Sequence, residues 1–223
     1  MHNQRVVFSR LLPFAAYIVL LALDSSMAEL FQWLHLNPKL TYLVRIAAVV
    51  GLLAYFWRDY SELKSAPVPS DYVYAAIAGC IVFIIWIFPY PTWMGGNDAA
   101  GFNPFQGEDK ISGMLWASMR LLGAALVVPV MEELFWRSYV MRWFDHENFL
   151  SVSPSRISGY AYIGSACLFA IEHNLWLAGL FAGLVYGDLY KTYKNLWVPI
   201  VAHAVTNALL GAWVLYSGQW GYW

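Results

Sequence analysis

Seven runs of apolar residues, separated by short polar segments, set the pattern of this sequence. A helix needs about 20 apolar residues to cross the roughly 30 Å hydrocarbon core of a bilayer. The runs approach or exceed that length, so they predict transmembrane helices over residues 11–33, 40–57, 71–89, 116–144, 157–176, 177–193 and 196–216. The region 157–193 could also be divided differently. We therefore expect an all-α, polytopic membrane helix bundle of about seven transmembrane helices, seven or eight in number.

The fourth run is longer than one crossing requires. Pro129 lies within it. Its ring removes one backbone hydrogen bond, so we expect a kink at this point of the helix.

The composition excludes most classes of soluble protein. Apolar residues make up 60% of the chain and charged residues 12%, against about 45–50% and about 25% in soluble domains. This excludes a disordered chain, an ordinary cytosolic enzyme and a nucleic-acid-binding protein. The net charge of −1 gives no long-range steering towards a charged partner. Cys80 and Cys167 lie in apolar runs and indicate neither a disulfide framework nor a Cys-based metal site. The partner that the composition implies is the lipid bilayer.

Basic residues are divided unequally between the two sides of the predicted bundle. Lys39 and Lys110 flank the runs on one side. Eight basic residues flank them on the other side: Arg5, Arg10, Arg58, Lys64, Arg142, Arg156, Lys191 and Lys194. Because loops rich in Lys and Arg stay in the cytoplasm, we expect a cytoplasmic N-terminus. A cleaved signal peptide ending near Ala28 is the alternative, but the apolar run continues to Trp33, so we expect this segment to remain as a helix.

Glu132, Glu133 and Arg137 lie within the fourth run, where a charged side chain costs at least about 2.5 kcal/mol. Glu133 and Arg137 are four residues apart with the acid first, an order that favours an ion pair on one helix face. Glu132 points about 100° away from Glu133 and has no such partner. We therefore expect Glu133 and Arg137 to be structural and Glu132 to be a candidate general base.

Two histidines and an asparagine lie in later runs. His203 and Asn207 are four residues apart and so share one face of the last predicted helix, whereas His173 lies near the end of the fifth. Taken singly, each is expected to form a hydrogen bond between helices. Counted inward at 1.5 Å per residue, however, Glu132, His173 and His203 lie at similar depths near mid-membrane, which predicts a shared hydrolytic site. Glu172, beside His173, is expected near the outer boundary and in contact with solvent.

These residues form three motifs in a fixed order, each in an apolar run. They are Glu-Glu-x-x-x-Arg (Glu132 to Arg137), Phe-x-x-x-His (Phe169 to His173) and His-x-x-x-Asn (His203 to Asn207). The set resembles the CAAX-protease and bacteriocin-processing family of intramembrane endopeptidases, which includes the type II CAAX prenyl endopeptidases, also called Abi proteins. Within it, the size and helix plan resemble the CAAX-protease-related proteins of bacterial exosortase systems.

The resemblance covers only part of the chain. Residues 115–212 look like the catalytic core helices of that family, within a single membrane domain over 1–223. Residues 1–110 carry no recognised motif.

The resemblance implies hydrolysis of a peptide bond near the terminus of a membrane-associated or prenylated protein or peptide. The site would lie in a cavity open to the cytoplasm, in a bacterial inner membrane. Glu132 would activate a water molecule, and His173 would help to hold or deprotonate it. His203 and Asn207 would donate hydrogen bonds to the oxyanion. Glu133, Arg137 and Phe169 would give the site structural support.

No cofactor is favoured. Glu132, His173 and His203 could in principle bind Zn²⁺ or another divalent metal, since carboxylates and imidazoles are zinc ligands. The metal-free mechanism is preferred, because a carboxamide and a second histidine suit an oxyanion hole better than a first metal shell.

Two other classes of protein fit part of the pattern. A proton-coupled membrane transporter also uses buried Glu, His and Arg, but no internal repeat with paired broken helices is evident. A catalytically silent membrane scaffold or immunity factor would be expected to have lost the motifs, and all are intact. No His-Glu-x-x-His zinc motif occurs. The sequence indicates neither the identity of the substrate nor the oligomeric state.

Overall fold

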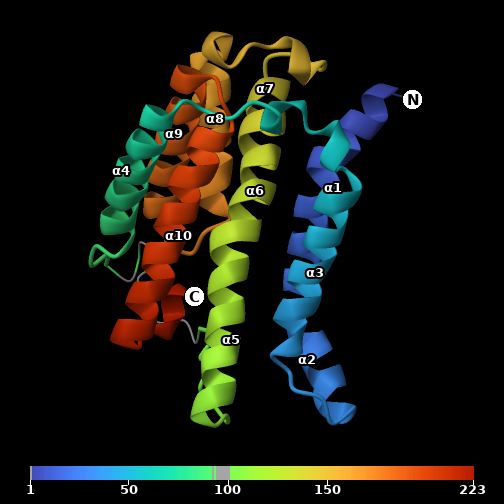
Figure 1. Cartoon of the computed structure of the whole chain (residues 1–223), viewed down its shortest axis with the longest axis vertical. Coiled ribbons are helices and arrows are strands. Elements are labelled where there is room, and N and C mark those ends of the chain that lie inside the picture. Colours follow the sequence, from blue (N-terminus) through green and yellow to red (C-terminus); the bar gives the residue numbers. More distant parts are fainter. Residues whose placement is uncertain (1, 92, 94–100) are drawn as a thin grey trace.

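All regular elements in the described part of the protein are helices. The computed structural model describes residues 2–91, 93 and 101–223, and no strand occurs among them. Figure 1 shows an N-terminal group of helices on one side, one long helix in the middle and the remaining helices on the other side. The predicted all-α class is confirmed.

The N-terminal group consists of α1 (His2–Ala22), α2 (Asp24–Trp33) and α3 (Leu40–Tyr55). The predicted span over 11–33 is divided between α1 and α2, because the regular α-helix is interrupted at Leu23. Helix α3 returns along α1. Two short 3₁₀ turns, η1 (Trp57–Asp59) and η2 (Ser61–Leu63), follow it.

The long middle helix covers Lys110–Trp143 without a break. It begins as α5 (Lys110–Leu122), where the Asp109 carboxylate caps the first turn by accepting hydrogen bonds from two backbone N–H groups. It continues through η4 (Gly123–Val127), α6 (Val128–Glu133), η5 (Leu134–Val140) and α7 (Met141–Trp143). Segments η4 and η5 are π-helical. Wide turns of this kind cluster at functional sites, and these two enclose the short helix that carries Glu132.

The third group consists of α4 (Pro69–Trp86), α8 (Gly159–Ile171), α9 (Trp176–Tyr193) and α10 (Trp197–Ser217). Helices α4 and α10 lie side by side over much of their length. Their close approach requires Gly79, where a Cβ atom would collide with the Ala202 carbonyl. Helices α8 and α9 form an antiparallel hairpin. Short turns η6 (Phe149–Ser151), η7 (Pro154–Arg156) and η8 (Trp220–Tyr222) complete the described elements.

The predicted number of membrane crossings is not confirmed. Among the described residues, four helices are long and apolar enough to cross a bilayer: Gln4–Ala22, Pro69–Trp86, Lys110–Trp143 and Trp197–Ser217. Two predicted spans correspond to shorter helices, α3 and α8. Helix α8 has 13 residues and is thus about 20 Å long, too short for a core of about 30 Å. A helix of this length that begins at one face of a bilayer ends within the hydrocarbon core, so its turn into α9, which holds Glu172 and His173, is expected at membrane depth.

The eight basic residues of the larger predicted group lie on elements at one end of the bundle. These are the start of α1, turns η1 and η7, the segment after η2, α7 and the end of α9, which Figure 1 places at the top. Lys39 and Lys110 adjoin the starts of α3 and α5 at the opposite end. We call the first end the basic end. That it faces the cytoplasm stays a prediction.

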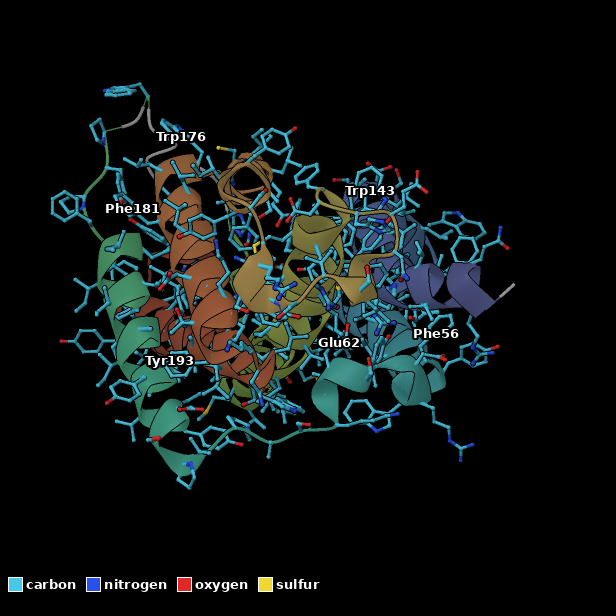
Figure 2. All side chains as sticks on the ribbon, turned by 90° about the horizontal axis from the view of Figure 1, so that it is seen from above. Phe56, Glu62, Trp143, Trp176, Phe181 and Tyr193 are labelled. Carbon is cyan, nitrogen blue, oxygen red and sulfur yellow. The ribbon has the colours of Figure 1, made fainter. Side chains whose placement is uncertain are left out.

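A buried ion-pair cluster ties the N-terminal group to the middle helix at the basic end. The Glu62 carboxylate lies 2.5 Å from Arg10 Nη2 and 3.0 Å from Arg142 Nη2. Ser138 also donates its hydroxyl hydrogen to Glu62. Seen from above in Figure 2, Glu62 lies between the middle helix and the N-terminal group. Residues without a recognised motif are thus joined to the helix that bears the motifs.

Candidate active site

A cavity of about 210 Å³ lies inside the bundle, and the four predicted catalytic residues line it. They are Glu132 from α6, His173 from the turn after α8, and His203 and Asn207 from α10. The structure therefore brings together side chains from three separate runs of sequence, as counting their depths predicts. Their catalytic roles stay predictions.

Glu132 has one carboxylate oxygen without a protein partner. Its side chain is 9% exposed, and among the described residues its Oε2 atom makes no hydrogen bond. The nearest basic nitrogen to that oxygen is Nε2 of His203, at 4.0 Å, which is beyond hydrogen-bond range. A buried carboxylate that faces a cavity without a partner is chemically suited to bind and deprotonate a water molecule.

Glu133 joins Arg137 to His203. Its Oε2 lies 3.1 Å from Arg137 Nε, and its Oε1 lies 3.0 Å from His203 Nδ1. The predicted ion pair between Glu133 and Arg137 is thus present, and Glu133 is fully buried. The bond to His203 was not predicted, because it depends on how α6 and α10 face each other.

The bond to Glu133 determines the chemistry of His203. An ionised carboxylate only accepts hydrogen bonds, so His203 must carry a hydrogen on Nδ1. In the neutral ring Nε2 is then an acceptor, and it can donate to an oxyanion only when the ring is protonated. The predicted donation from His203 to an oxyanion therefore requires the protonated ring. The Tyr186 ring is stacked on the imidazole, with the two ring centres 4.9 Å apart.

His173 is oriented by the backbone of its own helix. Its Nδ1 lies 2.7 Å from the Phe169 carbonyl oxygen, which can only accept, so Nδ1 carries the hydrogen and Nε2 keeps a lone pair. The Phe169 ring lies 4.6 Å from the His173 ring and 4.4 Å from the Arg137 guanidinium carbon. Phe169, which is 1% exposed, is therefore placed to position both residues.

Glu172 belongs to the same group, which the sequence reasoning missed. Glu172 is exposed, and Trp136 Nε1 donates to its Oε1 at 2.9 Å. Ligand atoms of Glu132, Glu172 and His173 all lie within 4.8 Å of one another. What brings Glu172 to this site is the end of α8 at Ile171, and the apolar run, which continues to residue 176, gave no signal of it.

Asn207 fills a gap in the backbone hydrogen bonds of the middle helix. In η4 the N–H of Val128 bonds to the carbonyl of Gly123, five residues earlier. Pro129 would serve Ala124 in the same way but has no N–H. Asn207 Nδ2 donates to that free Ala124 carbonyl at 2.8 Å. Asn207 also lines the cavity. The second N–H of its carboxamide is not used in the bond to Ala124.

The N-terminal helices and the C-terminal segment also contribute to the cavity wall. Tyr17 from α1, Tyr42 from α3 and Tyr222 and Trp223 line it. None of these positions belongs to a motif. Residues 1–110 therefore take part in forming the cavity, although the sequence indicated no role for them.

The cavity extends away from the basic end. On the middle helix it is lined by Glu132, Val128, Ala124 and Arg120, which are spaced four residues apart and therefore follow one helix face. Arg120 is the residue of this row closest to the start of α5, at the end opposite the basic end. A cavity open to the cytoplasm was expected. Given the predicted orientation, the described cavity lies on the other side of Glu132.

The donor set of Glu132, Glu172 and His173 fits a divalent metal in composition. Zinc binds carboxylate oxygen and imidazole nitrogen at about 2.0–2.2 Å, so two ligand atoms of one ion are at most about 4.4 Å apart. The three residues would need only a small inward movement. This group contains Glu172, whereas the predicted set contained His203.

Residues 114–209 match the family model of the Type II CAAX prenyl endopeptidase Rce1-like proteins. The matched segment contains all three motifs, which confirms the resemblance inferred from them. No curated protein and no solved structure matches the chain. The matched family is a family of proteases, and together with the four long apolar helices it indicates a multi-pass integral membrane protein.

Proposed function

We propose, from the family match over residues 114–209, that this chain is an intramembrane endopeptidase that hydrolyses a peptide bond near the terminus of a membrane-associated protein or peptide. The observation that carries the proposal is the unpartnered carboxylate oxygen of Glu132 in a cavity shared with His173, His203 and Asn207. Among the described residues Glu132 also forms no ion pair with an arginine, whereas the neighbouring Glu133 lies 3.1 Å from Arg137.

The reaction begins with a water molecule held between the Glu132 carboxylate and Nε2 of His173. Its oxygen attacks the carbonyl carbon of the substrate, and its proton passes to Glu132. The carbonyl oxygen becomes an oxyanion. Glu132 then returns the proton to the leaving amine as the carbon–nitrogen bond breaks, which gives a carboxylic acid and an amine.

The oxyanion is stabilised by the second N–H of Asn207 and by His203. His203 can donate from Nε2 only as an imidazolium, with Nδ1 bonded to Glu133. Glu133 and Arg137 therefore hold His203 in this orientation and supply the negative charge that balances it. Each donor of this kind contributes about 10²–10³ in rate.

The metal-free form is the preferred one. Were a divalent metal bound, Glu132, Glu172 and His173 would hold it, and it would supply Lewis-acid activation of the water. In that case the Glu132 carboxylate would have to act both as a metal ligand and as the base that accepts the proton of the water.

The test replaces Glu132 by Gln, which keeps the size and removes the base. We expect the cleavage rate of purified protein in detergent to fall at least about 10²-fold with the fold retained. Glu147→Gln, at an exposed carboxylate in the loop before η6, is the matched control and should keep the wild-type rate. Full activity of Glu132→Gln would move the base elsewhere. Proton-coupled solute flux in liposomes without proteolysis, abolished by Glu132→Gln, would instead indicate a transporter.

A further inference from the structure

Arg120 lies at the far end of the cavity from Glu132. The two residues are twelve positions apart on the middle helix and line the same cavity. At 1.5 Å per residue their backbones are about 18 Å apart along the helix axis. The cavity therefore has a carboxylate at one end and a guanidinium at the other.

The guanidinium of Arg120 is held in place by aromatic side chains. Its central carbon lies 4.6 Å from the centre of the Tyr42 ring and 5.4 Å from that of Phe102. The Tyr42 hydroxyl donates to the Arg120 backbone carbonyl at 3.0 Å. These contacts orient the planar group but do not neutralise its charge.

The charge of Arg120 has no acidic partner among the described residues. Its Nε is buried and makes no hydrogen bond there, and no described carboxylate lies within 4.0 Å of it. Arg120 as a whole is partly buried, whereas Arg10, Arg137 and Arg142 are buried and each form an ion pair with a glutamate. Even a partly desolvated arginine without a counter-charge is costly. Its position in the cavity wall indicates that an anion from outside the chain completes the pair.

We propose that Arg120 binds the C-terminal carboxylate of the peptide substrate, an inference that rests on the proposed function. A guanidinium can hold a carboxylate with two parallel hydrogen bonds. An extended peptide advances about 3.3 Å per residue, so a distance of about 18 Å accommodates at most about five residues between Glu132 and Arg120. Arg120 thus selects a free C-terminus and places the cleaved bond within about five residues of it.

The first arm of the test measures binding, independently of catalysis. Dansyl-labelled, N-palmitoylated decapeptides with randomised C-terminal sequences are prepared once as free acids and once as C-terminal amides. Binding to Glu132→Gln protein in phosphatidylcholine nanodiscs is followed by fluorescence. The acids should bind at least about 10-fold more tightly than the amides, as expected for a charge-assisted hydrogen bond. Adding Arg120→Gln should abolish this preference, and Arg120→Lys should keep part of it.

Arg45→Gln is the matched control. Arg45 also lies against the Tyr42 ring, at 5.4 Å, but it pairs with Asp24 and does not line the cavity. This variant should keep the preference for free acids. Equal binding of acids and amides by the Arg120-containing protein, or a preference that survives Arg120→Gln, would overturn the proposal. A third outcome would also overturn it: the protein retains phosphatidylglycerol only when Arg120 is present and binds acids and amides equally well. That outcome would indicate that Arg120 binds a lipid phosphate.

The second arm measures cleavage of the same peptides by mass spectrometry. We expect the wild-type protein to cleave acids about 10–100-fold faster than amides in kcat/KM, with bonds broken within five residues of the C-terminus. If acids bind preferentially through Arg120 but nothing is cleaved, the proposed function fails and the binding site stands. If peptides are cleaved with no preference for acids, the function stands and the role of Arg120 is wrong.

Discussion

His203 Nδ1 lies 3.0 Å from an oxygen of Glu133, and this contact separates the roles of two neighbouring glutamates. Glu133 Oε1 contacts His203, and Glu133 Oε2 lies 3.1 Å from Arg137 Nε in an ion pair, although that oxygen makes no hydrogen bond among the described residues. Glu132, the next residue in the chain, has an oxygen without a protein partner. The helix thus presents one carboxylate to the structure and the other to the cavity.

Glutamine substitutions at these two positions should therefore have opposite signatures. Glu133→Gln removes the charge that balances the buried Arg137, which should lower the free energy of unfolding by about 3–5 kcal/mol. Glu132→Gln breaks no ion pair and should leave that free energy within about 1 kcal/mol of wild type while activity is lost. Unfolding in mixed micelles, followed by circular dichroism, measures both. Equal destabilisation by the two substitutions would contradict this division of roles.

Asn207 is expected to have two separable functions. Asn207→Ala leaves the Ala124 carbonyl without a donor, which should cost about 1–3 kcal/mol of stability, and removes an oxyanion donor, which should lower kcat by about 10²–10³. Pro129→Ala supplies an N–H for the same carbonyl. In that background the loss of stability caused by Asn207→Ala should shrink, whereas its loss of kcat should not.

This double-mutant cycle separates structure from catalysis. Unfolding measurements give the coupling between positions 129 and 207, and steady-state kinetics give kcat and KM for each variant. If Pro129→Ala also rescues kcat, Asn207 acts only by holding the helix. A change in KM alone would likewise remove Asn207 from the oxyanion role.

Features that depend on one helix were predictable from the sequence. The ion pair between Glu133 and Arg137 follows from a spacing of four residues. The shared cavity of Glu132, His173 and His203 agrees with counting depth along each run. Local spacing and a uniform rise per residue are enough for these features.

Features that depend on how helices face each other were not predictable. The bond between His203 and Glu133 needs the orientation of α10 relative to α6. Tyr42 enters the cavity wall only because α3 lies beside the middle helix. Hydropathy also overestimated the length of the fifth helix, because the apolar run continues beyond Ile171, where α8 ends. That early end places Glu172 beside Glu132 and His173.

Activity is expected to survive exhaustive chelation. Because the metal-free mechanism draws its base from Glu132 alone, Glu172→Gln should lower kcat by less than about 10-fold, and elemental analysis should find no stoichiometric metal. A bound metal held by Glu132, Glu172 and His173 predicts the reverse. Loss of one ligand would then lower metal affinity and activity together, and adding Zn²⁺ in excess would restore part of the activity of Glu172→Gln.

Glu62 should make the stability of the protein depend on pH in the acid range. Burial alone would raise the pKa of its carboxyl, but the charge of Arg10 and hydrogen bonds from Arg10 and Ser138 outweigh burial and lower the pKa below 4.5, its ordinary value. A group whose pKa is lower in the folded state stabilises the fold above its unfolded-state pKa. This contribution should therefore be complete above about pH 4.5 and should be lost as the pH falls towards the folded-state value.

Glu62→Gln tests this relationship. The substitution leaves Arg10 and Arg142 buried without a carboxylate, so at pH 7 it should lower the free energy of unfolding by about 3–5 kcal/mol. At pH 3 the difference from wild type should be smaller, because the unfolded chain then binds a proton at Glu62 more readily than the folded, ion-paired carboxylate does. Micelle unfolding at both pH values measures the two differences. A difference that is the same at pH 7 and pH 3 would mean that Glu62 acts by shape and hydrogen bonding, and that its charge is not what joins the N-terminal helices to the helix of the active site.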